Sequence, residues 1–476
     1  MPRLMRCLYC GTLQDEPAGA KTCVRCGGEL SFTSEPPPDE RGSYLQVQME
    51  LDQVMAPAGQ NVERHLLVTL RAPAQVPTNE TAPTTAGRPP LSLTGVLDVS
   101  GSMQGVKIAQ AKDAVHQAVS RLHDGDSLAL VTFSNVIRTV LEPTSVDAHI
   151  RQVVQSALKE INAGGMTDLC GGLEEGLKHA SKARQDTNLV LLLSDGQANV
   201  GETDIEKVGY RAYEGRQKGI IVSTLGVGPD YNEALMVEVA TQGGGRFYHV
   251  QRADQIGAYL TGELGEVAAL AARETQIHLT IPAGAIVMPL SAAYPTQQVG
   301  TPYPLLGDSD QATITVGDIP CDTELEIPVR VALAGKRPGS KLSFEGHVTY
   351  RSPAGNQLKA SLNRVTVRFV EGPVFQLRDG VVPPIAERVL EHIKAANVLS
   401  VARAMAKSPE EGQKQRQAGI SRLRAYASLL GEERAAAETE DSEQHLRAMA
   451  AAPDMAKAGI AAAFARTRGT KKFDQS

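Results

Sequence analysis

The 476-residue sequence has no tryptophan, and aromatic residues make up only 4% of it. Because 42% of the residues are hydrophobic, any core must be built mainly from aliphatic side chains. The longest apolar runs, such as LVLLL at residues 189–193, are far too short to span a bilayer, so we expect no membrane insertion. The sequence has no large basic block and its net charge is −6, which argues against binding to nucleic acid. The length allows about three or four domains.

The N-terminal stretch MPRLMRCLYC lacks the apolar segment of a signal peptide, so we expect a cytoplasmic protein. Four of the six cysteines form two Cys-x2-Cys pairs, and a glycine follows each pair. Two such turns can converge on one tetrahedral Zn²⁺ ion, and two disulfides in a secreted domain are the alternative. The absence of a signal peptide favours a zinc ribbon over residues 1–33, whose ion supports folding rather than catalysis. The predicted zinc ligands are Cys7, Cys10, Cys23 and Cys26, and the remaining Cys170 and Cys321 are expected to be small buried residues.

Alternating apolar and polar residues predict β-strands on both sides of the central part of the chain. After a Pro-rich, charged linker at residues 34–43, the stretch YLQVQMELDQV and residues 62–70 alternate in this way. The same pattern returns at residues 275–281, 312–316, 323–333, 341–350 and 363–370. Because two strands alone would be marginally stable, we predict that residues 44–70 and 271–375 form one β-sandwich of about seven strands.

Residues 91–270 have a different pattern, in which short apolar strands alternate with helical stretches. This order predicts a doubly wound α/β domain with a mostly parallel sheet, inserted into the β-sandwich. From residue 384 to residue 467 the sequence is Ala-rich and helical, with Ser408 and Pro409 at the start of a second helix. We interpret these last residues as a structural helical bundle, and a specific docking surface is the alternative.

Oxygen-bearing side chains follow the ends of predicted strands in the α/β domain. Asp98, Ser100 and Ser102 lie in the stretch GVLDVSGSMQG, Thr167 lies in a loop that opens a helix, and Asp195 follows the strand NLVLLL. Ligands of doubly wound sheets bind at this edge, and two carboxylates with hydroxyls suit Mg²⁺ or Mn²⁺. Capping of the following helices is the alternative role of the hydroxyl groups.

The same residues do not favour catalysis. An aspartyl phosphotransferase built on Asp98 would need a second carboxylate two residues later, where the sequence has Ser100. The sequence contains no P-loop, no HExxH and no GxSxG motif. The glycines at residues 243–245 are explained by a turn into the next strand. We therefore expect that the protein is not an enzyme.

The stretches DVSGS, GGMTD and SDG, in that order, resemble the metal-ion-dependent adhesion site (MIDAS) of the von Willebrand factor A (VWA) domain. The resemblance covers about residues 91–265. It implies that Ser100, Ser102 and Thr167 bind the ion directly, and that Asp98 and Asp195 act mostly through water. Many intracellular members have glycine where this chain has methionine at position 166, which we expect to affect the packing or the rim rather than the ion.

An ion with few anionic ligands keeps much of its charge and favours an outside carboxylate as its last ligand. The resemblance therefore implies a cytosolic adaptor that binds an acidic residue of a partner protein through Mg²⁺ or Mn²⁺. The alternative is a structural subunit of a coat-like assembly whose metal site is vestigial, because the order of domains also resembles the much longer COPII trunk subunits. Intracellular bacterial VWA proteins with a zinc ribbon are more similar in composition. Some of them work beside AAA+ ATPases or in stress-response systems, which implies such a partner, although no residue selects one system.

Overall fold

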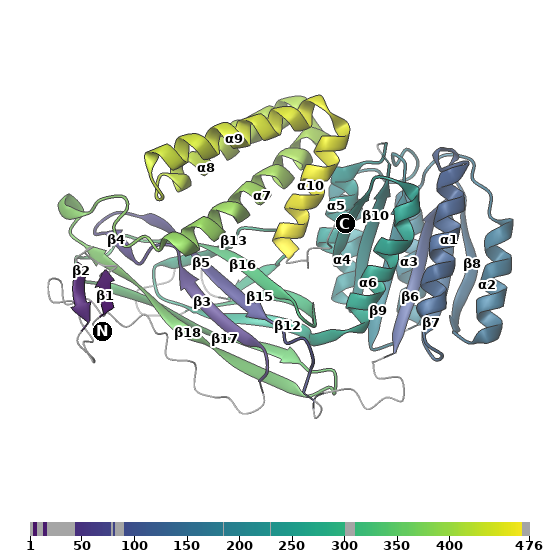
Figure 1. Ribbon diagram of the computed structural model, residues 1–476, viewed down its shortest axis with the longest axis horizontal. Helices are drawn as coiled ribbons and strands as arrows, with labels where there is room; N and C mark the ends of the chain where they lie inside the picture. The colour runs from purple at the N-terminus through teal and green to yellow at the C-terminus, as the bar shows by residue number, and fades with distance from the viewer. Residues whose placement is uncertain are drawn as a thin grey trace.

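The computed structural model describes residues 3–6, 13–16, 43–77, 80, 90–183, 185–228, 230–299 and 310–468. An α/β domain lies beside a pair of mainly antiparallel sheets (Figure 1). The C-terminal helices α7 to α10 form a group that packs against the sheets and against the α/β domain. A short hairpin of β1 (Arg3–Arg6) and β2 (Leu13–Glu16) comes first in the chain. The four cysteines of the predicted zinc ribbon, and the predicted linker up to residue 42, lie outside the described residues.

The α/β domain is built on a six-stranded sheet. In sheet order its strands are β11 (Gly244–Val250), β10 (Ile220–Val227), β9 (Thr187–Ser194), β6 (Leu91–Asp98), β7 (Ser127–Phe133) and β8 (Ile137–Ser145). All neighbouring strands are parallel except β8, which runs antiparallel to β7. The prediction of a mostly parallel α/β domain is therefore confirmed.

Helices cover both faces of this sheet because its strands are apolar on both sides, and every residue of β7 and β9 is buried. The helical segments are η2 (Gly101–Met103), α1 (Val106–Arg121), α2 (Ala148–Glu160), α3 (Leu169–Lys182), α4 (Ile205–Gln217), α5 (Glu233–Gln242), η3 (Ala253–Gln255) and α6 (Ile256–Ala268). The core on one face includes residues of α1, α2 and α6, and the core on the other includes residues of α3, α4 and α5. Side chains cap the first turns of four of these helices; the capping residues are Asp147, Asp168, Asp204 and Asn232.

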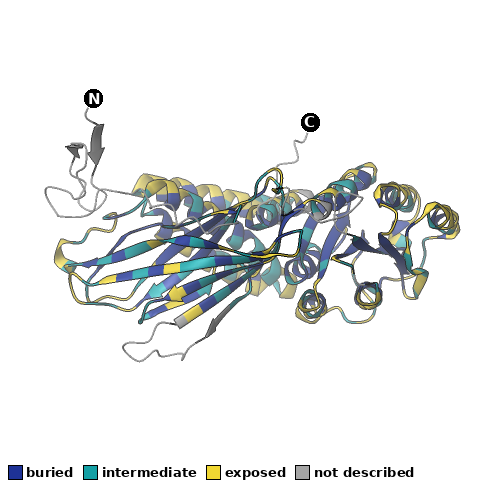
Figure 2. Ribbon diagram, turned by 90° about the horizontal axis from the view of Figure 1, so that it is seen from below, coloured by how far each residue is buried: buried dark blue, intermediate teal, exposed yellow. Residues whose placement is uncertain are grey.

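The remaining strands form two sheets that share one apolar core. The six-stranded sheet contains β14 (Thr296–Val299), β15 (Asp310–Pro320), β12 (Leu270–Ile281), β17 (Lys341–Arg351), β18 (Gln357–Val370) and β4 (Met55–Pro57). The four-stranded sheet contains β13 (Ala285–Pro289), β16 (Glu324–Leu333), β5 (Val62–Arg71) and β3 (Gln46–Leu51). Figure 2 shows that burial alternates along many of these strands, which is the pattern expected when one face meets a core.

Strands from before and after the α/β domain pair directly with one another. β5 pairs antiparallel with β16 along its whole length, and β4 pairs with the end of β18. The Asn363 side chain in β18 also bonds both main-chain groups of Met49 in β3, each at 2.8 Å, so the two sheets are linked at that point. Within the described residues the two sheets hold ten strands rather than about seven, because β4, β13 and β14 are too short to give an alternating pattern in the sequence.

The four C-terminal helices follow a short η4 turn (Gly372–Val374). They are α7 (Pro383–Lys407), α8 (Pro409–Ala427), α9 (Glu432–Ala451) and α10 (Pro453–Arg468). Ser408 caps α8 as expected, because its hydroxyl accepts the Glu411 main-chain N–H at 3.1 Å. α7 packs on the four-stranded sheet with Val389 and its neighbours, and on the α/β domain with Val398 and Val401. Within the described residues, no helix is both long and apolar enough to cross a membrane.

Candidate metal centre

The five predicted ligands come together at the carboxyl ends of two neighbouring strands. Asp98 is the last residue of β6, and Asp195 directly follows β9, which is the parallel neighbour of β6. Ser100 and Ser102 stand at the start of the η2 turn after β6, and Thr167 lies just before α3. Parallel strands end at the same edge of a sheet, so this topology alone accounts for the approach of segments that lie far apart in the sequence.

Hydrogen bonds connect the side chains of this cluster. The Ser100 and Ser102 hydroxyl oxygens lie 3.1 Å apart, and Ser102 donates to Asp195 Oδ1 at 2.8 Å. Asp98 accepts the Ser100 main-chain N–H at 2.8 Å and the Ser194 hydroxyl at 2.5 Å. Both carboxylates are completely buried, whereas Ser102 is exposed. The cluster therefore lies in the floor of a surface site, with Ser102 at its rim.

Gly196 marks the point toward which the oxygens converge. A Cβ atom on this residue would lie 3.1 Å from Ser102 Oγ, 3.3 Å from Thr167 Oγ1 and 3.8 Å from Asp98 Oδ2. Three side-chain oxygens, two from the end of β6 and the turn after it and one from the loop before α3, thus surround one small space. Hydroxyl and carboxylate oxygens are ligands that Mg²⁺ and Mn²⁺ accept, so the donor set fits such an ion. The described residues contain no group of three or more His, Cys, Asp or Glu that could hold a metal, so a site here depends on hydroxyls.

Main-chain contacts hold the Thr167 loop against the first segment. The Gly101 N–H donates to the Gly165 carbonyl at 2.9 Å, and Gly165 has a φ of 88°, which favours glycine. The Asn199 side chain accepts the Thr167 N–H at 2.8 Å, and the Asn199 N–H donates back to the Thr167 carbonyl. Sequence reasoning missed Asn199, because its role depends on a contact between two loops and not on any spacing motif.

The charge around this cluster is poorly balanced. Burial raises the pKa of Asp98, and hydrogen bonds from Ser100 and Ser194 offset only part of that effect. The ammonium of Lys107, in the first turn of α1, contacts Asp195 Oδ2. Sequence reasoning missed Lys107 as well. Two buried carboxylates therefore meet one lysine, and the arrangement favours a further cation.

Comparison with known proteins agrees with this geometry. Residues 93–261 match the family model of the von Willebrand factor type A domain, so this part of the chain is a VWA domain. VWA domains typically mediate protein–protein interaction through a MIDAS.

Among curated proteins, the Escherichia coli protein YfbK is 27% identical over 195 residues, which cover 40% of this chain and 34% of YfbK. Human inter-alpha-trypsin inhibitor heavy chain H3 is 28% identical over 187 residues, which cover 38% of this chain and 21% of that protein. The chain thus matches about a third of one of these relatives and about a fifth of the other.

Two solved structures resemble most of the chain and not only its VWA domain. A von Willebrand factor type A protein from Catenulispora acidiphila has a TM-score of 0.61 at 17% identity, and the match covers 91% of this chain and 99% of that one. The ArnB paralogue VWA2 from Sulfolobus acidocaldarius has a TM-score of 0.56 at 16% identity, with coverage of 90% and 100%. At these identities the likeness concerns the fold alone.

Proposed function

We propose that this protein binds a partner protein through a divalent ion, Mg²⁺ or Mn²⁺, held at its VWA domain. The observation that carries the proposal is the convergence of the Ser102, Thr167 and Asp98 oxygens on Gly196. The residues that hold the ion are Asp98, Ser100, Ser102, Thr167 and Asp195, with the three hydroxyls as direct ligands and the aspartates acting mostly through water. The bound ion supplies a positive charge that accepts a carboxylate from the partner. The protein then acts as an adaptor without enzymatic activity.

Exposed apolar side chains around the cluster support a protein partner. Val106 is 71% exposed and directly precedes Lys107, and Met166 is 54% exposed and directly precedes Thr167. Val136 is 48% exposed and lies in the loop whose Ser134 carbonyl accepts the Asp168 N–H. Exposed apolar groups near a charged centre are typical of a contact surface. The acidic residue of the partner is therefore expected to have apolar neighbours.

The remaining parts of the chain complete the proposal. Residues 1–33 form a zinc ribbon in which Cys7, Cys10, Cys23 and Cys26 hold one Zn²⁺ for folding. The setting is cytoplasmic, as in the intracellular bacterial type, and the partner is an AAA+ ATPase or a stress-system component. Elemental analysis of freshly purified protein is expected to find one zinc per chain that is lost in Cys7→Ser. Protein without zinc would contradict the ribbon.

We also propose a division into domains. The VWA domain, residues 91–270, is an insertion in a β-sandwich of residues 44–70 and 271–375, and residues 384–467 form a helical domain. The pairing of β5 with β16 supports the sandwich, because these strands come from opposite sides of the insertion.

Two observations favour a second candidate function. The Lys107 ammonium partly neutralises Asp195 without any ion, and α7 packs against both the VWA domain and the four-stranded sheet. Both features suit a structural subunit of an assembly in which the metal site is vestigial. This alternative predicts partners that are indifferent to metal.

A pull-down from the native cell distinguishes the two functions. The full chain and its Asp98→Ala variant are each used as bait, once with Mg²⁺ and once with EDTA. A partner retained only by the unchanged chain in Mg²⁺ is expected. Identical sets of bound proteins in all four samples would contradict metal-dependent binding and favour the structural subunit.

A further inference from the structure

A second site lies away from the metal centre, between the C-terminal helices and the outer face of the four-stranded sheet. A cavity of about 780 Å³ opens there between α7 and α8 on one side and β4, β5 and β16 on the other. Protein interiors usually leave few voids larger than a water molecule. Small-molecule sites typically have volumes of about 300–1,000 Å³ and occur where domains meet. The cavity shares no lining residue with the metal centre.

A buried arginine lines this cavity without an acidic partner. Arg64 is 7% exposed, and no carboxylate among the described residues lies within ion-pair distance of its guanidinium. Its Nε and Nη2 donate to the Met55 carbonyl at 3.1 and 2.6 Å, and its Nη1 donates to the Glu63 carbonyl at 2.7 Å. Main-chain carbonyls hold the guanidinium in place, and Asp52 acts on its charge from beyond ion-pair distance. Burial lowers the pKa of Arg64, which agrees with an unfavourable environment for its charge.

The carboxylate whose charge acts on Arg64, Asp52, accepts hydrogen bonds from other groups. Asp52 accepts the His65 main-chain N–H at 2.9 Å, the His65 ring N–H at 2.9 Å and the Tyr426 hydroxyl at 3.1 Å. These three donors occupy most of the acceptor sites of Asp52, and Asp52 forms no direct ion pair with Arg64 within the described residues.

Two further arginines increase the positive charge of the cavity. Arg330 has one acidic partner, Glu63 at 3.5 Å, and its Nε is buried without a hydrogen bond. Arg422 of α8 lines the opening, is exposed, and forms no ion pair within the described part of the chain. Three guanidinium groups therefore line the cavity beside two carboxylates, Asp52 and Glu63, in a chain whose net charge is −6.

The rest of the wall is largely apolar. The apolar lining residues include Val62, Leu290, Phe375, Leu377, Ile393 and Leu429. Leu377 is 53% exposed at the edge of the cavity. The site thus combines an excess of guanidinium charge with an apolar surface of ligand size. Guanidinium groups bind carboxylate and phosphate groups in a fork geometry, and an apolar wall favours an apolar body on the same ligand.

We propose that this cavity binds a small amphipathic anion, with one anionic group held by the arginines and an apolar body against α7 and α8. The proposal is independent of the metal centre, and EDTA should leave this binding unchanged. The anionic group has two common sources, a carboxylate and a phosphate monoester. Dodecanoate and dodecyl phosphate represent them as probes.

The test uses the full chain and the fluorescent dye 8-anilinonaphthalene-1-sulfonate, which carries one anionic group on an aromatic body. The dye should bind at one saturable site, and its uncharged analogue N-phenyl-1-naphthylamine should bind at least about tenfold more weakly. Arg422→Gln should weaken dye binding by about tenfold, which corresponds to about 1.4 kcal/mol. Arg424→Gln is the matched control, because this exposed residue of the same helix does not line the cavity.

A second variant blocks the space instead of removing charge. Ala425 is exposed and lines the cavity, so Ala425→Trp should abolish dye binding while the far-ultraviolet circular dichroism stays unchanged. If that variant does not fold, the Arg422→Gln result decides. Displacement of the dye by dodecanoate or dodecyl phosphate supports the proposal and identifies the anionic group. Equal binding of the uncharged dye, unchanged binding to Arg422→Gln, or failure of both probes to displace the dye would overturn it.

Discussion

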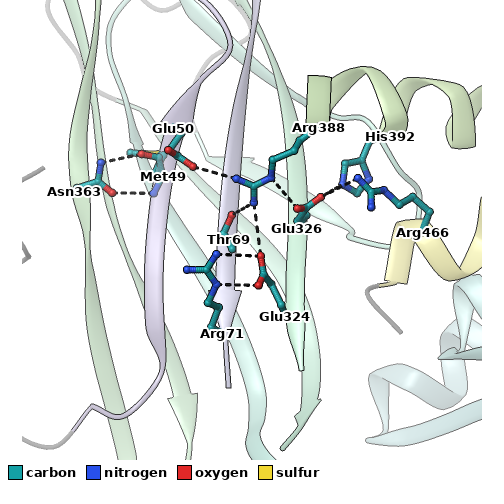
Figure 3. Close-up of polar contacts among 10 residues, drawn as sticks. All are labelled: Met49, Glu50, Thr69, Arg71, Glu324, Glu326, Asn363, Arg388, His392 and Arg466. Atoms are coloured by element: carbon teal, nitrogen blue, oxygen red, sulfur yellow. Dashed lines mark hydrogen bonds and ion pairs between the residues drawn. The ribbon is translucent and has the colours of Figure 1, made fainter. Parts of the chain in front are cut away.

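The carboxylates of the metal centre and those beneath α7 have opposite surroundings. Beneath α7, Glu326 accepts Arg388 Nε at 2.8 Å and His392 Nε2 at 2.9 Å, and Arg466 of α10 lies 3.4 Å away (Figure 3). Glu324 pairs with Arg71 at 2.9 Å on the same face of the sheet. Cations from helices and strands thus surround these acids. At the metal centre two carboxylates are fully buried, and among the described residues the ammonium of Lys107, which contacts Asp195, is the one cation paired with either of them.

The pKa shifts follow this difference. Burial by itself would raise the pKa of Glu326, but hydrogen bonds from His392 and Arg388 outweigh it and lower the pKa to about 2. Burial raises the pKa of Asp98, and there the opposing hydrogen bonds come from hydroxyl and main-chain donors that carry no charge. The cluster around Glu326, in which charges are balanced, stabilises the attachment of α7 to the sheet. An unbalanced cluster of oxygens at the edge of a sheet is suited to receive a cation.

The largest expected effect is the loss of folding when the two clusters are separated. A fragment of residues 91–268 contains the whole metal centre and a complete sheet, and it should fold and bind Mg²⁺ with the affinity of the full chain. A fragment of residues 271–476 lacks β3 and β5, which leaves β16 with an unpaired edge. It should be unfolded or aggregated by circular dichroism and gel filtration. A well-folded second fragment would contradict the shared sandwich.

The next effect concerns the metal centre alone. Asp98→Ala should weaken Mg²⁺ binding by about 100-fold or more, because the position of the hydroxyl ligands depends on this carboxylate. The fold should persist, since the variant removes an uncompensated buried charge rather than apolar contacts. Calorimetric titration measures the affinity, and Asp113→Ala, an exposed acid on α1, is the control. An unchanged affinity in Asp98→Ala would exclude the site.

A smaller effect is expected in the balanced cluster. Glu326→Gln should lower the free energy of unfolding by about 2 kcal/mol at pH 7, measured in urea, and should leave Mg²⁺ binding intact. Glu324→Gln is the control, because its 44% exposed side chain should contribute less than about 1 kcal/mol.

The sign of the pH dependence follows from the lowered pKa of Glu326. Its stabilising effect is complete above the ordinary glutamate pKa of 4.5 and is lost as the pH falls toward about 2. The stability difference between the unchanged chain and Glu326→Gln should therefore shrink over this range. A difference that stays constant would mean that the ion pairs contribute nothing.

The smallest effect is expected from the single cation of the metal centre. Lys107→Met removes the ammonium that competes with the ion for Asp195, so Mg²⁺ should bind about threefold to tenfold more tightly. Lys112→Met, at a half-buried position of the same helix, should leave the affinity unchanged. Weaker binding in Lys107→Met would show that the lysine supports the site instead of competing with the ion.

Much of the fold could be predicted from local pattern. The alternation at residues 323–333 corresponds to β16, in which Leu325, Ile327, Val329, Val331 and Leu333 are all buried. The prediction was less accurate at the end of the α/β domain, where the residue composition favours a helix but the chain pairs as a strand. The α/β domain was predicted to end at residue 270, but α6 ends at Ala268 and β12 of the neighbouring sheet begins at Leu270. This Ala-rich stretch has helical propensity, and its pairing with β15 and β17 overrides that propensity.

Some residues of the candidate metal centre could likewise be predicted from the sequence, and others could not. Asp98, Ser100, Ser102, Thr167 and Asp195 could be proposed from spacing, because strand ends and motifs are visible in a sequence. Lys107 and Asn199 could not, since each acts through a side chain that reaches a segment distant in the sequence. The three arginines that line the cavity beneath α7 and α8 could not be predicted as a group either. Their common surroundings come from three separate elements that only the folded chain brings together.

The most direct test of metal-bridged binding is a double-mutant cycle with the captured partner. Ser102→Ala should weaken partner binding by on the order of 100-fold, while the free energy of unfolding changes by only about 1 kcal/mol. Exchanging the partner's acidic residue for its amide should cause the same loss, and the combined changes should not add, because both break one contact. EDTA should have the effect of either change. Full additivity, or binding that survives EDTA, would contradict the account.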